Sequence, residues 1–244
     1  MIEGKISQKI IWFAFPIFLG NLFQQLYNVV DSLVVGNVLG KEALAAVSST
    51  GSLIFLIIGF ISGIFVGASV IISRYFGADD KENLSTAVHT TIAFGFIAGI
   101  IITTIGVGFS PWFLKLMRTP DDVFIEAVTY LRIYFAGGVG IVMYNACMGV
   151  FQAIGDSKHP LYYLIIAALT NVVLDILFVA VCNFGIEGAA IATVISQFVS
   201  ATLAFVKLTR IDDCYKIYLK QIKIDYYMLK SLMKMGFPTG VQNS

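Results

Sequence analysis

Two aspartates lie in stretches of the sequence that otherwise carry no charge. Asp31 follows the uncharged run Ile10–Val30, and Asp175 interrupts the apolar run Pro160–Ile186. An aspartate at the centre of a bilayer helix costs about 2.5 to 3.5 kcal/mol, so such residues mark functional sites by default. Carboxylates of this kind bind a hard cation through oxygen or a proton, because burial and a nearby like charge favour the protonated form.

Neutral side chains with oxygen atoms share the helical faces of the two aspartates. Asn171 lies four residues before Asp175, while Tyr27 and Gln24 lie four and seven residues before Asp31. Residues at these spacings stand above one another on a helix. The spacing therefore predicts one oxygen-rich, protonatable stripe on each of two helices.

The two aspartates are expected at similar depth. If the first span runs outward to about Gly36 and the fifth to about Cys182, Asp31 and Asp175 lie five and seven residues below the outer surface. That depth is roughly 8 to 10 Å at 1.5 Å per residue, and Thr193 in the next span falls at the same level. We expect one layer that holds a proton or a cation. The plainer alternative is that each aspartate only hydrogen-bonds a neighbouring helix.

The sequence offers no comparable pattern for enzyme chemistry. His89 and His159 have no partner at metal-ligand spacing, and the three cysteines have no C-x-x-C spacing that would indicate a zinc site or a disulfide framework. The glycines of 137–140 are not followed by Lys-Ser/Thr, so they indicate close helix packing rather than a phosphate loop. We expect a protein that is not an enzyme and needs no cofactor.

The composition indicates the elements that position these residues. The 244-residue chain is 58% hydrophobic and 13% charged, with a net charge of +1 and a mean hydropathy of +0.85. Average chains are about half apolar and a quarter charged. This excludes ordinary soluble, disordered and nucleic-acid-binding classes and predicts an all-α polytopic membrane protein. Six runs are expected to span the membrane, and a seventh begins near Tyr226: Ile10–Val30, Ala43–Ser73, Asn83–Leu114, Ile133–Gly155, Pro160–Ile186 and Ala189–Val206.

Basic residues set the expected orientation, because cytoplasmic loops are enriched in lysine and arginine. Twelve lie on the side of the N-terminus and three on the other, so the N-terminus is predicted to be cytoplasmic in a multi-pass protein of the cell membrane. Arg132, near the outer end of the fourth run, serves as an interfacial anchor or as a lining residue. The twelve are Lys5, Lys9, Arg74, Lys81, Lys158, Lys207, Arg210, Lys216, Lys220, Lys223, Lys230 and Lys234.

A short internal repeat indicates two related halves. The pattern F-P-x-x-x-x-N occurs at residues 15–21 and again at 237–243, each time after cytoplasmic lysines. Six spans separate the copies, so both start in the same orientation, as in transporters with parallel repeats. We therefore expect a six-helix lobe at 1–206, a basic cytoplasmic linker at 207–225, and the start of helix seven of a second lobe at 226–244. The whole protein would have twelve helices.

Several motifs, in order and spacing, resemble the multidrug and toxic compound extrusion (MATE) family of transporters. They cover essentially the whole chain: Pro16 with Gln24-Gln25-Leu26-Tyr27-Asn28 and Asp31 before Gly36, then Gly40-Lys41-Glu42-Ala43, Tyr130-Leu131-Arg132, Gln152-Ala153-Ile154-Gly155-Asp156 with Pro160, and Asn171-Val172-Val173-Leu174-Asp175.

The resemblance implies export of cationic or amphiphilic compounds in exchange for H⁺ or Na⁺. Its coupling residues fall on Asp31, Asp175, Asn171 and Thr193, which would also hold Na⁺. Tyr27, Gln24 and Tyr130 would line the cavity, and Pro16 matches the proline at which the first helix bends. Partners would be small-molecule substrates, membrane lipid and the carboxyl-terminal lobe, with no nucleic acid.

Two other functions fit the same architecture. One is a lipid-linked oligosaccharide flippase of the same superfamily, although inward-facing arginine and lysine are scarce in this sequence. The other is a non-transporting fragment that packs on a partner lobe as a structural module.

Overall fold

Long helices make up most of the computed structural model, which describes the backbone of residues 6–244 and the side chains of residues 12–244. In lipid every backbone N–H and C=O needs an internal partner, so uncharged runs of this length fold as helices. The elements are α1 (Ile6–Val38), α2 (Lys41–Gly77), α3 (Lys81–Leu116), α4 (Phe124–Ala136), α5 (Gly138–Ala153), α6 (Lys158–Asp175), the π-helix η1 (Ile176–Val181), α7 (Gly185–Arg210), the 3₁₀-helix η2 (Leu219–Gln221) and α8 (Tyr226–Asn243). The predicted all-α class is confirmed.

Most of these helices are long and apolar enough to cross a membrane. Length and hydropathy select α2, α3, α6 with η1, and α7 among the described residues, and the bent pair α4 and α5 makes a fifth span. With 33 residues α1 is also long enough to span a membrane, because a span needs about 20. The predicted multi-pass membrane class is confirmed. Lys5, used above to assign orientation, lies outside the described residues.

The fourth span is broken, which the sequence analysis did not predict. The run Ile133–Gly155, expected as a single helix, is divided between α4, which begins at Phe124, and α5. The two helices meet at Gly137 with a bend of 50°. A Cβ on Gly137 would lie 2.7 Å from the side chain of Val194 on α7. The bend therefore lies where the backbone of Gly137 packs closely against the Val194 side chain. The expected close helix packing at the glycines of 137–140 is confirmed.

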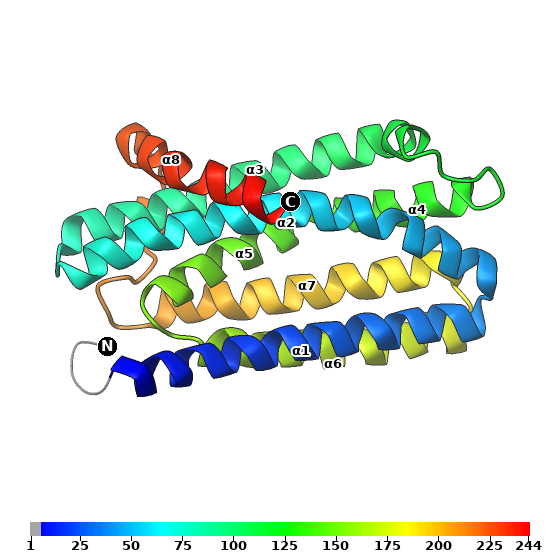
Figure 1. Ribbon diagram of the computed structural model, residues 1–244, viewed down its shortest axis with the longest axis horizontal. Helices are drawn as coiled ribbons and strands as arrows, with labels where there is room; N and C mark the ends of the chain where they lie inside the picture. Colours follow the sequence, from blue (N-terminus) through cyan, green and yellow to red (C-terminus); the bar gives the residue numbers. More distant parts are fainter. Residues whose placement is uncertain (1–5) are drawn as a thin grey trace.

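The helices form an elongated bundle in which α1 lies beside α6 and α8 lies against α2 (Figure 1). Two clusters of buried apolar side chains hold it together. One lies toward the α1–α2 turn and includes Val35, Phe135 and Ile186. The larger one is centred on α2, α3 and α5 and also takes in Ile217 and Leu232 from the linker and α8. Apolar residues at the bundle surface, such as those of 96–105, face outward as in a lipid-exposed helix.

The segment between α7 and α8 is attached to the lobe. The Tyr218 N–H donates to His89 Nε2 (2.9 Å), the Asp225 N–H donates to Thr90 Oγ1 (3.3 Å), and the Ile217 N–H donates to the Leu208 carbonyl (2.9 Å). His89, which has no metal-ligand partner at a suitable spacing in the sequence, is only 3% exposed. It therefore fixes the linker to the end of α3.

The aspartate that caps the start of α3 makes the stability of the fold depend on pH. Asp80 accepts hydrogen bonds from Asn83 Nδ2 (2.7 Å) and from the Asn83 N–H (3.2 Å), and these bonds lower the pKa of Asp80 below its usual value. A carboxyl group with a lowered pKa in the folded state stabilises the fold above its unfolded pKa of about 3.9, and this stabilisation is lost as pH falls through the folded pKa.

We expect Asp80→Ala to lower the Tm of the purified full-length protein at pH 7 and to lower it less at the acid end of a pH series. The matched control is Asp79→Asn, because residue 79 has φ 53°, a conformation that asparagine tolerates. An equal loss of Tm at both ends of the series would contradict the assignment.

Candidate functional site: a buried carboxylate pair

Three helices meet around the two aspartates. Asp31 projects from α1, Asp175 and Asn171 from the end of α6, and Thr193 from α7. All four are buried, with Asp175 and Asn171 fully shielded from solvent. The structure brings together Asp31, Asp175 and Thr193, for which the sequence predicts a shared layer, and Asn171, predicted on the same helical face as Asp175.

Hydrogen bonds connect the cluster through Thr193 and Asn171. The Tyr27 hydroxyl lies 3.5 Å from Thr193 Oγ1. The Asn171 amide has two orientations: one donates to Thr193 Oγ1 at 3.3 Å, and the other donates to Asp175 Oδ2 at 2.8 Å while its oxygen accepts from the Thr193 N–H at 3.3 Å. We adopt the second, because it satisfies both ends of the amide.

The two carboxyl groups lie close enough for their charges to interact. Two ionised carboxylates near each other repel, which favours a proton on one of the pair. Asp31 Oδ1 and Asp175 Oδ1 are both buried without a hydrogen-bond partner. Unpaired buried carboxylate oxygens are costly, so a proton or a cation bound to these oxygens would stabilise the site.

Two tyrosines of α4 complete the surroundings of the pair. Tyr130 is buried, and it lies near the two aspartates and near Tyr27 and Tyr134. The Tyr130 and Tyr134 rings stack with centroids 6.4 Å apart. Tyr134 was missed from the sequence, although its position one helical turn after Tyr130 was a usable signal.

Two predicted residues of α1 lie apart from the cluster. Gln24 is exposed, one turn before Tyr27 on the same helix. Pro16 is buried, and α1 continues through it as a single helix. The roles assigned to them, cavity lining and helix bending, stay predictions.

A π-helix follows the site directly. The sequence predicts one helix through Pro160–Ile186, but α6 ends at Asp175 and the backbone widens into η1, where the Cys182 N–H donates to the Leu177 carbonyl at 2.8 Å. Such π-turns occur mostly at functional sites. The widened turn leaves Asp175 at a junction between two helix geometries.

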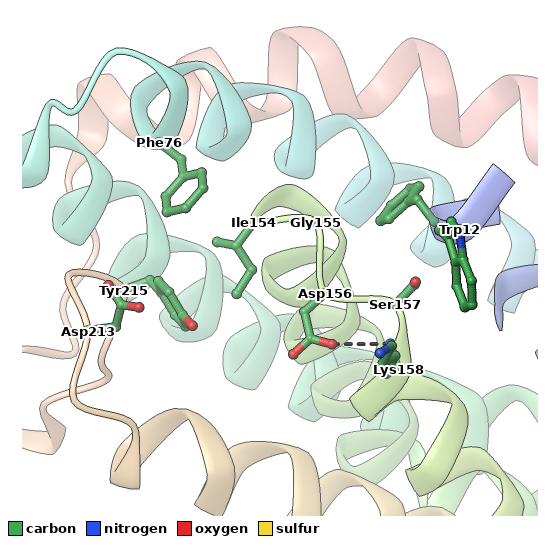
Figure 2. Close-up of a pocket in the computed structure, with 10 residues that line it drawn as sticks. Trp12, Phe76, Ile154, Gly155, Asp156, Ser157, Lys158, Asp213 and Tyr215 are labelled. Carbon is green, nitrogen blue, oxygen red and sulfur yellow. Dashed lines mark hydrogen bonds between the residues drawn. The ribbon is translucent and has the colours of Figure 1, made fainter. Parts of the chain in front are cut away.

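A separate cavity of about 550 Å³ opens at the other end of the bundle. Aromatic side chains and the turn Gly155–Lys158 line it, with Asp213 and Tyr215 from the linker (Figure 2). Asp156 accepts a hydrogen bond there from the Lys158 N–H (3.1 Å). The carboxylate pair is not part of this cavity.

Membrane-length helices that meet at a buried pair of carboxylates define one lobe of a membrane transporter. The model of the MatE family matches residues 16–177, and the chain belongs to this family. Its members are transporters, not enzymes.

Three similar proteins illustrate the relationship. The probable multidrug resistance protein YoeA of Bacillus subtilis (strain 168) is 34% identical over 99% of this chain and 55% of its own length. A multidrug resistance MATE family transporter of the MOP superfamily in its outward-facing conformation matches with a TM-score of 0.89 at 28% identity, over 98% of this chain and 53% of the other. An inward-facing conformation of such a transporter gives 0.82 at 29% identity, over 90% of this chain and 50% of the other. The chain spans about half the length of these relatives.

Proposed function

We propose that the full-length protein is a multidrug efflux antiporter that exports cationic or amphiphilic compounds across the cytoplasmic membrane in exchange for H⁺ or Na⁺. Multidrug resistance is the activity named for YoeA. The observation that carries the coupling is the buried pair Asp31 and Asp175, each with an Oδ1 atom that has no hydrogen-bond partner.

In the proton-coupled form the pair exchanges one proton for drug release. With one proton shared, the site carries a single negative charge, which suits a cationic drug nearby. A second proton on the unpaired oxygen neutralises the pair and removes the cost of the buried charge. The amide of Asn171 holds Asp175 in place through its bond to Oδ2.

In the sodium-coupled form the same oxygens bind the ion. Both carboxylates, the Asn171 oxygen and the Thr193 hydroxyl provide hard oxygen ligands around the pair. Carboxylate, amide and hydroxyl oxygens are the donors that hard cations take. Either ion shifts the protein between its conformations only by its difference in affinity for them.

The proposed conformational change involves α1 and the two lobes. α1 carries both Pro16 and Asp31, and its buried proline has no N–H to keep the helix rigid. Neutralisation of Asp31 would allow α1 to bend, and the bend would shrink the proposed drug-binding cavity. The proposed bodies are the lobe 1–206 and the second lobe starting at 226, joined by 207–225, with the N-terminus in the cytoplasm.

The test is ethidium transport by the full-length protein in liposomes under an imposed pH gradient or an imposed Na⁺ gradient. Transport that follows one gradient supports the antiporter and names the ion. Transport of ethidium with neither gradient would contradict the coupling. Absence of ethidium transport together with movement of a labelled lipid-linked oligosaccharide would favour the flippase.

A conservative pair of substitutions tests Thr193 as a site residue. We expect Thr193→Val to raise the coupling-ion concentration that gives half-maximal activation about fivefold to tenfold. A typical hydrogen bond contributes about 1 kcal/mol, and 1.4 kcal/mol corresponds to a tenfold change in affinity. Thr193→Ser keeps the hydroxyl and should activate like wild type. Equal activation curves for valine and serine would remove Thr193 from the site.

A further inference from the structure

A cavity of about 460 Å³ opens beside the turn that joins α3 to α4. This turn lies at the end of the bundle opposite the linker (Figure 1), and in the proposed topology that end lies on the outer side of the membrane. We call the cavity the α3–α4 pocket. The residues that line it come from the turn and from the two helix ends: Lys115, Arg118, Thr119, Pro120, Asp121 and Phe124.

The backbone of this turn is held in place by its own hydrogen bonds. The Arg118 N–H donates to the Lys115 carbonyl (3.1 Å), and the Thr119 N–H donates to the Leu114 carbonyl (3.1 Å). Leu114 and Val123, on either side of the turn, are 0% and 3% exposed and belong to the apolar cluster near the α1–α2 turn. Because these backbone N–H groups are already bonded, a ligand in the pocket would be held by side chains.

The pocket carries two cationic side chains that have no anionic partner. Among residues 12–244 neither Lys115 nor Arg118 forms an ion pair, although Asp121 lines the same cavity. Lysine and arginine are enriched on the cytoplasmic side of membrane proteins, so two of them in one outer turn indicate a role other than orientation. Thr119 adds a hydroxyl oxygen that is buried without a hydrogen-bond partner. Two cations and an unpaired hydroxyl suit the oxygens of a phosphate group.

An exposed apolar face of α3 leads up to the pocket. Its members follow one another at spacings of three or four residues, and all are exposed: Ile101, Ile105, Phe109, Trp112 and Leu116. Residues at these spacings share one side of a helix, and the face is about 22 Å long at 1.5 Å per residue. That length exceeds half of the hydrocarbon core of about 30 Å, and tryptophan is enriched at the membrane–water boundary. An apolar face that spans one leaflet and ends at a cationic pocket matches a phospholipid, whose acyl chains continue from its phosphate.

We propose that the α3–α4 pocket binds the phosphate group of a phospholipid of the outer leaflet, with an acyl chain along the exposed face of α3. Lys115 and Arg118 balance the charge of the phosphate, and the Thr119 hydroxyl donates to one of its oxygens. Asp121 opposes the anion, so its charge limits the affinity for a headgroup with a net negative charge. The inference depends on the proposed topology and not on the compound that the protein transports.

The test measures lipid binding next to Trp112 in the purified full-length protein in detergent micelles. The probe is phosphatidylglycerol with brominated acyl chains, because bromine quenches tryptophan fluorescence at close range, and Trp112→Phe gives the baseline from other tryptophans. We expect saturable quenching of Trp112. Lys115→Gln and Arg118→Gln should each raise the lipid fraction that gives half-maximal quenching about fivefold, which corresponds to about 1 kcal/mol for one basic residue.

A substitution of opposite sign separates binding from damage to the fold. Asp121→Asn removes the negative charge from the same pocket, so it should lower the lipid fraction at half-maximal quenching while the two glutamine variants raise it. A general loss of structure would not shift the curve in opposite directions. The matched control is Lys41→Gln, a basic residue predicted on the same side of the membrane that does not line the pocket, and it should bind like the parent.

Two further probes distinguish a phospholipid from its parts. Brominated diacylglycerol has the acyl chains without the phosphate, and its quenching should be the same in the parent and in the glutamine variants. Inorganic phosphate at the concentration of the lipid should not displace the brominated phosphatidylglycerol, because it makes no contact with the face of α3. Displacement by equal phosphate would overturn the lipid as the ligand. Equal quenching curves for the parent and the double variant Lys115→Gln/Arg118→Gln would overturn the phosphate site.

Discussion

The double variant Asp31→Asn/Asp175→Asn of the full-length protein is expected to lose ion-driven efflux altogether. Both residues are buried on adjoining helices, each with one carboxylate oxygen that has no partner. Asparagine keeps the shape of the side chain but removes the charge and the protonatable oxygen. Without either group the site has nothing to exchange for the drug, so efflux should no longer respond to a pH or Na⁺ gradient.

The single variants should show a graded effect. A bond to a charged group contributes about 1.5 to 3 kcal/mol, so removing one carboxylate should weaken binding of the coupling ion about 10- to 150-fold. The measurement is ethidium efflux as a function of pH and of Na⁺ concentration for each variant. Asp175, fully buried and bonded to Asn171, should be the more sensitive position.

Folding must be separated from coupling in this experiment. Removing the buried negative charge of the pair does not take away a salt bridge, because no basic side chain pairs with either aspartate among the described residues. The Tm of the double variant should therefore equal or exceed that of wild type. Asp79→Asn, in an exposed turn, is the matched control. Gradient-driven efflux that persists in a well-folded double variant would move the coupling site to another part of the protein.

The sequence was sufficient to predict that Asp31, Asp175, Asn171 and Thr193 lie together, because the relevant patterns are local and periodic. Asn171 and Asp175 share a face by their spacing alone, and charge is so rare in the spans that Asp31 stands out. Matching Thr193 to them needed only the direction of each span and the rise per residue. These arguments depend on membrane geometry, which fixes helix length and direction more strictly than water does.

Features that depend on tertiary contact could not be predicted in the same way. The bend falls at Gly137, where a Cβ would lie 2.7 Å from the Val194 side chain on α7, and the junction of α6 with η1 leaves no distinctive residue pattern. The basic residues of the linker predict a polar, solvent-exposed connection. They give no sign that Ile217 is buried or that the Tyr218 N–H donates to His89. Each of these requires knowledge of which distant segment lies opposite.

Two glycines of α3 should respond oppositely to the same substitution. A Cβ on Gly106 would lie 2.3 Å from Cγ of the Phe135 ring on α4, whereas a Cβ on Gly108 would have nothing within 4 Å. Phe135 is only 1% exposed, so its ring has no free space to move into. We expect Gly106→Ala to cost about 1 to 3 kcal/mol of unfolding free energy, as overpacking of a core does. Gly108→Ala should be neutral or stabilise by up to about 1 kcal/mol, because alanine is the better helix former.

The measurement is thermal or denaturant unfolding of the full-length protein in detergent, with Phe135→Leu added to each variant. If the clash with the ring causes the loss, the two substitutions should not be additive. The double variant Gly106→Ala/Phe135→Leu should have an unfolding free energy about 0.5 to 3 kcal/mol above the value that the two single effects predict. The same addition should leave the effect of Gly108→Ala unchanged. A loss in Gly106→Ala that is simply additive with Phe135→Leu would contradict the contact.

The packing at Gly106 also has a consequence for the coupling site. Phe135 follows Tyr134 directly on α4, and Tyr130 lies on the same helix near Asp31 and Asp175. An α4 displaced by an extra methyl on α3 would therefore shift two tyrosines relative to the carboxylate pair. We expect Gly106→Ala to weaken activation by the coupling ion as well as stability, and Phe135→Leu to restore both. Restored stability with activation still weakened would mean that the tyrosines are positioned by contacts other than the α3–α4 packing.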